Sequence, residues 1–170
     1  MLHYFAYGSN MSTRRMLQRI PQAVRLTTAV LKGHTLVFHK RGRDGSAKCD
    51  AFYTKRSSDR IYGVIYQIPQ EHLPILNAFE GLGKGYEIAR ALVELPHGSS
   101  DRSEMEVFFY QATDIDPKLK PFKWYKVHVL RGALENRFPA EYCEKIKRVP
   151  AILDPNRERM AKELSIYRHR

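Results

Sequence analysis

A loop that could expose backbone amides follows the first apolar run of the sequence. Residues Tyr7-Gly8-Ser9-Asn10 stand where a buried strand would pass into a helix. At such a turn several N–H groups lack partners in the chain, and glycine lets a ligand approach the main chain closely. This arrangement favours binding of a carboxylate or a developing oxyanion. An ordinary strand–helix turn uses the same residues for conformational reasons, and the four residues alone leave both interpretations open.

Glu80 is the second candidate for chemistry. It ends a predicted amphipathic helix between the apolar residues Phe79 and Leu82, and three glycines follow within five residues. A carboxylate held against apolar groups loses hydration and becomes a better base near neutrality. The commoner fate of a glutamate is an exposed helix end, although there it would oppose the helix dipole. Both interpretations stay open from the residues alone.

Other chemistry-bearing residues give weaker signals. Tyr86 and Tyr125 could hydrogen-bond a ligand, but each taken singly is better explained by core packing. The seven histidines show no metal-ligand spacing, and no nucleophile-elbow or dinucleotide-binding motif is present. The run Gly81 to Gly85 lacks the GK[ST] ending of a phosphate loop. We therefore predict neither a metal site nor an organic cofactor.

The chain is strongly basic, with 29 Lys and Arg against 18 Asp and Glu. Clusters occur at Lys40 to Arg43, Lys118 to Lys126 and Lys145 to Arg148, without an aromatic RNA-binding motif, zinc finger or helix-turn-helix pattern beside them. The surface could steer small anions toward a cleft. We interpret the clusters as a solvated basic surface and do not predict a nucleic-acid partner.

Strand-like segments dominate the first two thirds of the sequence, and helices the last third. Period-two and apolar runs predict strands at Leu2 to Tyr7, Ala23 to Leu31, His34 to His39, Cys49 to Thr54, Ile61 to Ile68, Tyr86 to Leu95 and Met105 to Ala112. The fourth and fifth of these are expected to form a hairpin. Helices are predicted at residues 10–19, 71–80, 122–137 and 140–148. This order favours an α+β domain around a curved antiparallel sheet or small barrel.

The length of 170 residues fits one domain, which we place at residues 1–150. The charged segment 151–170 is expected to be a helical tail that packs only loosely. No apolar run approaches the ~18 residues of a membrane span, and the N-terminal residues resemble a first strand more than a signal peptide. Two isolated cysteines, Cys49 and Cys143, fit a reducing compartment. We expect a cytoplasmic protein that does not bind membranes, with a homodimer as a possible assembly.

Three ordered motifs resemble the γ-glutamylcyclotransferase family, including its AIG2-like members. Tyr4 to Met11 resembles the opening motif of that family. Leu76 to Gly81, followed by Gly85-Tyr86, resembles the segment with its catalytic glutamate, and Trp124 to Tyr142 resembles its C-terminal helical pair. The match runs in order from about Tyr4 to about Pro150, and three ordered motifs are far more specific than any one of them.

This resemblance implies a fold, a reaction and a site. The fold is a small mixed, mostly antiparallel β-barrel flanked by helices. The reaction converts γ-glutamyl amino acids or amines to 5-oxoproline and the free amino acid or amine, without a cofactor. Glu80 matches the acid–base glutamate. The positions that match the substrate cavity are Tyr4, Phe5, Ala6, Tyr7, Gly8, Ser9, Asn10, Tyr86 and Tyr125.

Three alternatives stay open at this point. A relative could act on γ-glutamyl amines, or could remove a γ-glutamyl group in a biosynthetic route, and the leaving-group pocket would decide among these. A non-catalytic basic binding module on the same fold is the third alternative, because a fold does not guarantee an activity.

Overall fold

The computed structural model describes residues 1–96 and 103–168. Five strands form a closed barrel in the order β1-β5-β2-β6-β7. Their bounds are β1 Leu2–Ala6, β2 Val24–Lys32, β5 Arg60–Ile68, β6 Tyr86–Glu94 and β7 Glu104–Ala112. Neighbouring strands pair antiparallel except where β7 closes the barrel on β1, which is a parallel contact at Tyr4 and Phe108. The predicted mixed, mostly antiparallel barrel is confirmed.

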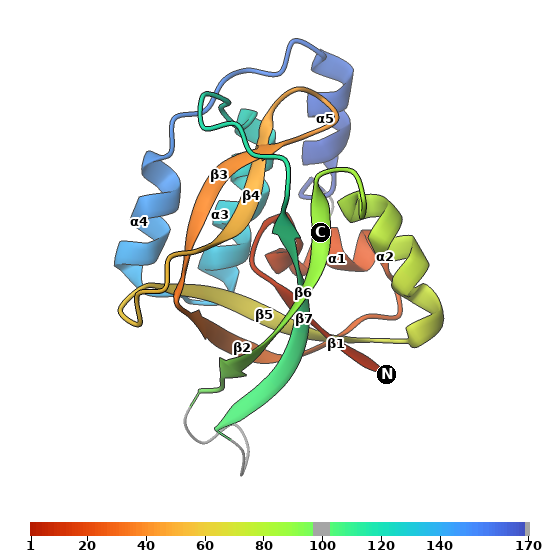
Figure 1. Ribbon diagram of the computed structural model, residues 1–170. Helices are drawn as coiled ribbons and strands as arrows, with labels where there is room; N and C mark the ends of the chain where they lie inside the picture. The colour runs from red at the N-terminus through yellow and green to blue at the C-terminus, as the bar shows by residue number, and fades with distance from the viewer. Residues whose placement is uncertain (97–102, 169–170) are drawn as a thin grey trace.

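Strands β3 (His34–Arg41) and β4 (Ala47–Tyr53) form a separate two-stranded sheet that extends from the barrel (Figure 1). The predicted hairpin between the fourth and fifth strands is wrong, because β4 pairs with β3 while β5 pairs with β1 and β2. The turn after β3 explains the difference. Gly42 N–H donates to Ser46 O at 2.8 Å, and Asp44 accepts bonds from the Ser46 amide and hydroxyl, so the chain reverses before β4.

Helices flank the barrel as predicted (Figure 1). They are α1 Thr13–Arg19, α2 Leu73–Glu80, α3 Lys123–Glu135, α4 Ala140–Arg148 and α5 Arg157–Ser165, with short 3₁₀ turns η1 Ser9–Met11 and η2 Gln70–His72. Helix α2 ends where Gly81 adopts a φ of 77°, a left-handed conformation that favours glycine. Among the described residues, no helix combines the length and the apolar character needed to cross a membrane.

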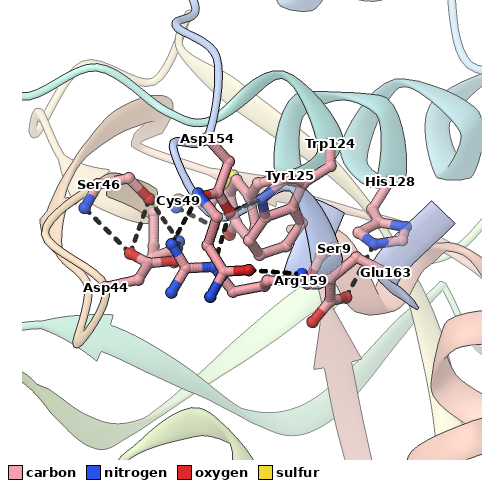
Figure 2. A network of polar contacts seen from close by, with 12 residues as sticks. Ser9, Asp44, Ser46, Cys49, Trp124, Tyr125, His128, Asp154, Arg159 and Glu163 are labelled. Carbon is pink, nitrogen blue, oxygen red and sulfur yellow. Dashed lines mark hydrogen bonds and ion pairs between the residues drawn. The ribbon is translucent and has the colours of Figure 1, made fainter. Parts of the chain in front are cut away.

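The C-terminal segment is attached to the rest of the fold more firmly than its charged composition suggests. Asp154 accepts hydrogen bonds from Trp124 Nε1 at 2.8 Å and from two nitrogens of Arg159 at 2.6 Å each (Figure 2). The Arg159 bonds lower the pKa of Asp154 to about 2. Further along α5, Glu163 forms an ion pair with Arg15, which is only 5% exposed. Loose packing was therefore the wrong expectation, because a buried guanidinium in α1 takes its counter-charge from α5.

His128 makes the stability of this junction dependent on pH. The ring is fully buried, with Nε2 at 3.0 Å from Arg15 Nη1 and Nδ1 at 2.7 Å from Tyr167 Oη. Because a guanidinium only donates, Nε2 must accept and Nδ1 carries the proton. Glu163 lies 3.2 Å from the same Nε2, but its charge is neutralised by Arg15. Burial lowers the pKa of His128 from 6.5 to about 4.

We therefore expect the free energy of unfolding to fall as the pH drops from about 6.5 to about 4. In that range the unfolded chain binds a proton at His128 that the folded chain does not, and the difference amounts to about 1–3 kcal/mol. Urea denaturation of the wild type and of His128→Gln at pH 7, 5.5 and 4.5 measures it. The variant should be less stable than the wild type at pH 7, but its free energy of unfolding should fall less on acidification. Parallel pH dependence in the two proteins would contradict the assignment.

Candidate active site

Glu80 lies at the end of α2 and faces polar partners. Its Oε1 atom accepts hydrogen bonds from Asn10 Nδ2 at 2.8 Å and from Arg19 Nη1 at 2.9 Å. The apolar surroundings expected for this carboxylate are thus only partial, although Phe79 covers the Arg19 guanidinium at 5.1 Å from its ring centroid. Both bonds end on Oε1. Within residues 1–96 and 103–168, Oε2 has no hydrogen-bond partner, so it is free to meet a substrate.

Asn10 connects the loop to this carboxylate. Its Nδ2 atom also lies 3.2 Å from Tyr4 Oη, and its Oδ1 accepts from Arg19 at 3.0 Å. The amide is thereby oriented without ambiguity, since the guanidinium can face only the oxygen. Three segments, the loop, α1 and α2, meet at one side chain. Sequence reasoning missed Arg19; its only signal was a basic residue at the end of the helix that follows the loop.

The loop from Tyr7 to Asn10 contains backbone amides that have no partner among the described residues. Gly8 precedes η1, and the first amide of the turn to bond within the chain is that of Met11, which donates to Gly8 O at 3.1 Å. The amides of Ser9 and Asn10 donate to no group in the described part of the chain. Arg15 Nε donates to the Ser9 hydroxyl at 3.1 Å. This pair of amides can receive a carboxylate or an oxyanion.

Beside Glu80 is a narrow inner pocket walled by tyrosines. It is lined by Tyr4, Tyr7, Gly8, Ser9, Asn10, Cys49, Glu80, Tyr86, Tyr110 and Tyr125. Hydrogen bonds to the main chain hold the rings, because Tyr86 Oη donates to Cys49 O and Tyr125 Oη accepts from Cys49 N–H at 3.0 Å. Figure 2 shows Tyr125 and Cys49 side by side. The structure thus brings together eight of the ten predicted site residues.

Phe5 and Ala6 are the two predicted residues that do not line the pocket. Both are fully buried in the core, and the ring of Phe5 lies so close to Gly63 that a β-carbon there would be 2.4 Å away. Alternation along β1 explains the position of Phe5, because Tyr4 and Phe5 point to opposite faces of the strand. The pocket instead gains Tyr110, whose hydroxyl donates to Asn77 at 2.6 Å, and Cys49.

The titratable side chains of the inner pocket differ sharply in their ability to accept a proton. Burial raises the pKa of Tyr4, Tyr7, Tyr86 and Tyr125 well above 10, and it raises that of Tyr110 as well. Burial also raises the pKa of the Cys49 thiol to about 12, so this cysteine is neither a nucleophile nor a base at neutral pH. Among the described lining residues, Glu80 is the one carboxylate and therefore the one group suited to accepting a proton.

A wider cavity of about 180 Å³ opens outward from the inner pocket, and we call it the mouth. Its lining includes Arg15, Arg19, Lys40, Gly42, Arg43, Asp44, Lys48, Phe79 and Trp124, together with Ser9, Glu80, Tyr86 and Tyr125, which line both spaces. The cluster Lys40 to Arg43 was interpreted as solvated surface, and for Lys40 this is wrong, because its side chain is only 3% exposed. Strand β3 carries it inward to the cavity.

No group of three potential metal ligands comes together within the described residues. One hydrogen-bonded carboxylate, free backbone amides and a shell of neutral phenols can transfer a proton and stabilise an oxyanion.

The fold belongs to a class defined by solved γ-glutamyl cyclotransferases. A solved structure described as gamma-glutamyl cyclotransferase superposes with a TM-score of 0.80 and 26% identity, over 95% of this chain and 98% of that one. The model of the AIG2-like family matches residues 60–146, and the chain belongs to that family. The curated gamma-glutamylcyclotransferase of Homo sapiens is 29% identical over 156 residues, covering 90% of this chain and 79% of that protein. That of Bos taurus is 29% identical over 149 residues, covering 86% and 77%.

Proposed function

We propose that the protein releases 5-oxoproline from γ-glutamyl amino acids or γ-glutamyl amines, through attack of the α-amine on the γ-carbonyl. One observation carries this proposal. A pocket whose phenols and thiol stay neutral at physiological pH is lined by a single carboxylate, Glu80, and by Ser9 and Asn10, whose backbone amides have no partner among the described residues. The relatives described as gamma-glutamylcyclotransferases support the same reaction.

The substrate contains both reacting groups. When the γ-glutamyl chain folds back, the attack of its α-amine becomes intramolecular, and a high effective molarity supplies much of the rate. A bond forms between this nitrogen and the γ-carbon, and the bond from the γ-carbon to the leaving nitrogen breaks. Glu80 takes a proton from the α-amine and returns a proton to the leaving amine, so no net proton is consumed.

The loop and the tyrosines position the reacting chain. The amides of Ser9 and Asn10 would hold the carboxylate of the glutamyl group or its developing oxyanion. The hydrogen bond from Asn10 to Glu80 would keep the carboxylate directed toward the same point. The phenol walls exclude water from the γ-carbonyl, which favours cyclisation over hydrolysis.

The experiment is to incubate the purified protein with γ-glutamyl-alanine and to measure 5-oxoproline and free alanine. Equal amounts of both products are expected. The isomer α-glutamyl-alanine is the matched control and should release no alanine, because its amide lies on the other carboxyl group. Nε-(γ-glutamyl)-lysine tests the γ-glutamyl amine alternative. Failure to release 5-oxoproline from any γ-glutamyl compound by the folded protein would favour the non-catalytic module.

A further inference from the structure

The mouth of the cavity carries more positive than negative charge. Five cationic side chains and two carboxylates line this cavity. Three of the cations are paired with carboxylates: Arg15 with Glu163, Arg19 with Glu80 and Lys48 with Asp44. Within residues 1–96 and 103–168, Lys40 and Arg43 have no carboxylate at ion-pair distance. An unpaired cation in a cavity is a binding group for an anion.

Of these two cations, Lys40 gives the stronger evidence for an anionic ligand. Its side chain is 3% exposed, and its ammonium lies 4.5 Å from the centroid of the Tyr86 ring. The hydrogen bond described for it is a long one, 3.3 Å to Lys84 O, whereas an ammonium can donate three. Burial lowers the pKa of Lys40, while the charges of Asp114 and Glu80 act in the opposite direction. Burying an ammonium that has no carboxylate at ion-pair distance is costly, and an anionic ligand in the mouth would offset part of this cost.

Arg43 is presented to the same cavity by a rigid turn. A β-carbon at Gly42 would lie 2.8 Å from Ser46 O and 2.9 Å from Asp44 Oδ1, so the turn is closed tightly. Asp44 is itself held by the Ser46 amide at 3.0 Å. The guanidinium of Arg43 lies beside Gly81, directly after Glu80, where a β-carbon would be 3.4 Å from Nη2. Arg43 therefore lies at the same end of the mouth as Glu80.

The position of these cations assigns them to one part of the substrate. Ser9, Glu80, Tyr86 and Tyr125 line both the inner pocket and the mouth. In the proposed reaction the amide that breaks would lie at this junction, beside Glu80, with the glutamyl group in the inner pocket, where no lysine or arginine is part of the lining. The leaving group would then point into the mouth, toward Lys40 and Arg43.

We propose that the mouth is a subsite for the carboxylate of the leaving amino acid, with Lys40 and Arg43 as its binding groups. This inference rests on the proposed function and narrows its substrates to γ-glutamyl amino acids. A leaving amino acid carries its carboxylate one carbon from the nitrogen that is released, within reach of both cations. A leaving amine with no carboxylate would leave Lys40 buried without an ion-pair partner, so the subsite discriminates against γ-glutamyl amines.

Two substrates of nearly equal size test the subsite. γ-Glutamyl-alanine has a carboxylate on the leaving group, and γ-glutamyl-alaninamide has a neutral amide in its place. We expect the wild type to show kcat/KM at least about tenfold higher for the acid, since hydrogen bonds to charged groups discriminate to this degree. Equal kcat/KM for the two substrates would overturn the proposal.

Substitutions of Lys40 and Arg43 test whether these residues cause the preference for the acid over the amide. Arg43→Gln and Lys40→Met should each lower kcat/KM for γ-glutamyl-alanine about tenfold, mainly by raising KM. For γ-glutamyl-alaninamide, kcat/KM should change less than about threefold. Arg90→Gln is the matched control, because it removes one positive charge from β6, where Arg90 faces Glu106. Arg90→Gln should leave kcat/KM for both substrates nearly unchanged. A loss that is equal for both substrates in Arg43→Gln and Lys40→Met would mean a structural role and would contradict the proposal.

Failure of the proposed reaction would be recognised separately. If neither substrate yields 5-oxoproline, the same two compounds can be compared by calorimetric binding to the wild type and to Arg43→Gln. Tighter binding of the acid than of the amide, lost in the variant, would support the anion subsite without the reaction. Equal affinity for both compounds, or no binding of either, would overturn the subsite as well.

Discussion

Glu80→Gln should lower kcat by about a thousandfold, the contribution expected from a general acid–base group. Glutamine has the same shape, and its amide oxygen can still accept the bonds that Asn10 and Arg19 make to Oε1. It cannot accept a proton from the α-amine. The substrate should therefore bind with a similar KM, while release of 5-oxoproline from γ-glutamyl-alanine nearly stops.

A matched control separates the chemistry from the loss of one charge. Glu87→Gln makes the same change at an exposed position on β6 and should retain full activity. The melting temperature of Glu80→Gln should fall only modestly, because Arg19 keeps its bond to Asn10. If Glu80→Gln retained more than about a tenth of wild-type kcat, Glu80 would not be the acid–base group.

Gly132→Ala should destabilise the protein and damage the site together. A β-carbon at Gly132 would lie 2.5 Å from Met11 Cβ and 2.7 Å from the Ser12 backbone nitrogen. Because these are atoms of the chain that carries Ser9 and Asn10, α3 or the loop must move. We expect the free energy of unfolding to fall by about 1–3 kcal/mol. We also expect kcat/KM to fall by more than about tenfold, since a small displacement of positioning groups is costly in rate.

Leu134→Ala is the control for this prediction. Leu134 lies two residues further along α3 and is 56% exposed, so the change should alter the free energy of unfolding by less than about 0.5 kcal/mol. Urea denaturation and the 5-oxoproline assay, at a temperature where both variants are folded, give the comparison. A destabilised Gly132→Ala with undiminished kcat/KM would show that α3 does not position the loop.

The fold could be predicted in most of its elements because local patterns determine them. Alternating apolar residues gave the strands, and the stop at Gly81 gave the end of α2. Pairing between strands was harder, because it depends on contacts far apart in the sequence. The hairpin expected between β4 and β5 failed for this reason. The tight turn from Gly42 to Ser46 joins β3 to β4, while both edges of β5 are used by the barrel.

The candidate site was predictable only where its residues belong to a motif. Glu80 and the loop from Tyr7 to Asn10 could be proposed from the sequence, and the structure places them in contact through Asn10. Arg19 and Lys40 have no motif of their own. Their roles depend on where α1 and β3 lie against the barrel, and in the sequence both look like ordinary basic surface residues. Burial, which is a property of the folded chain, is what distinguishes Lys40.

The attachment of α5 to Arg15 has a consequence for how the protein folds. Arg15, which holds Ser9, has its counter-charge on Glu163, 148 residues later in the chain. Strand β1 likewise needs β7 to close the barrel. The loop from Tyr7 to Asn10 therefore reaches its final arrangement only when these distant segments have come together. Contacts between segments so far apart in the sequence form slowly, and until they form the apolar β1 is exposed to association with other chains.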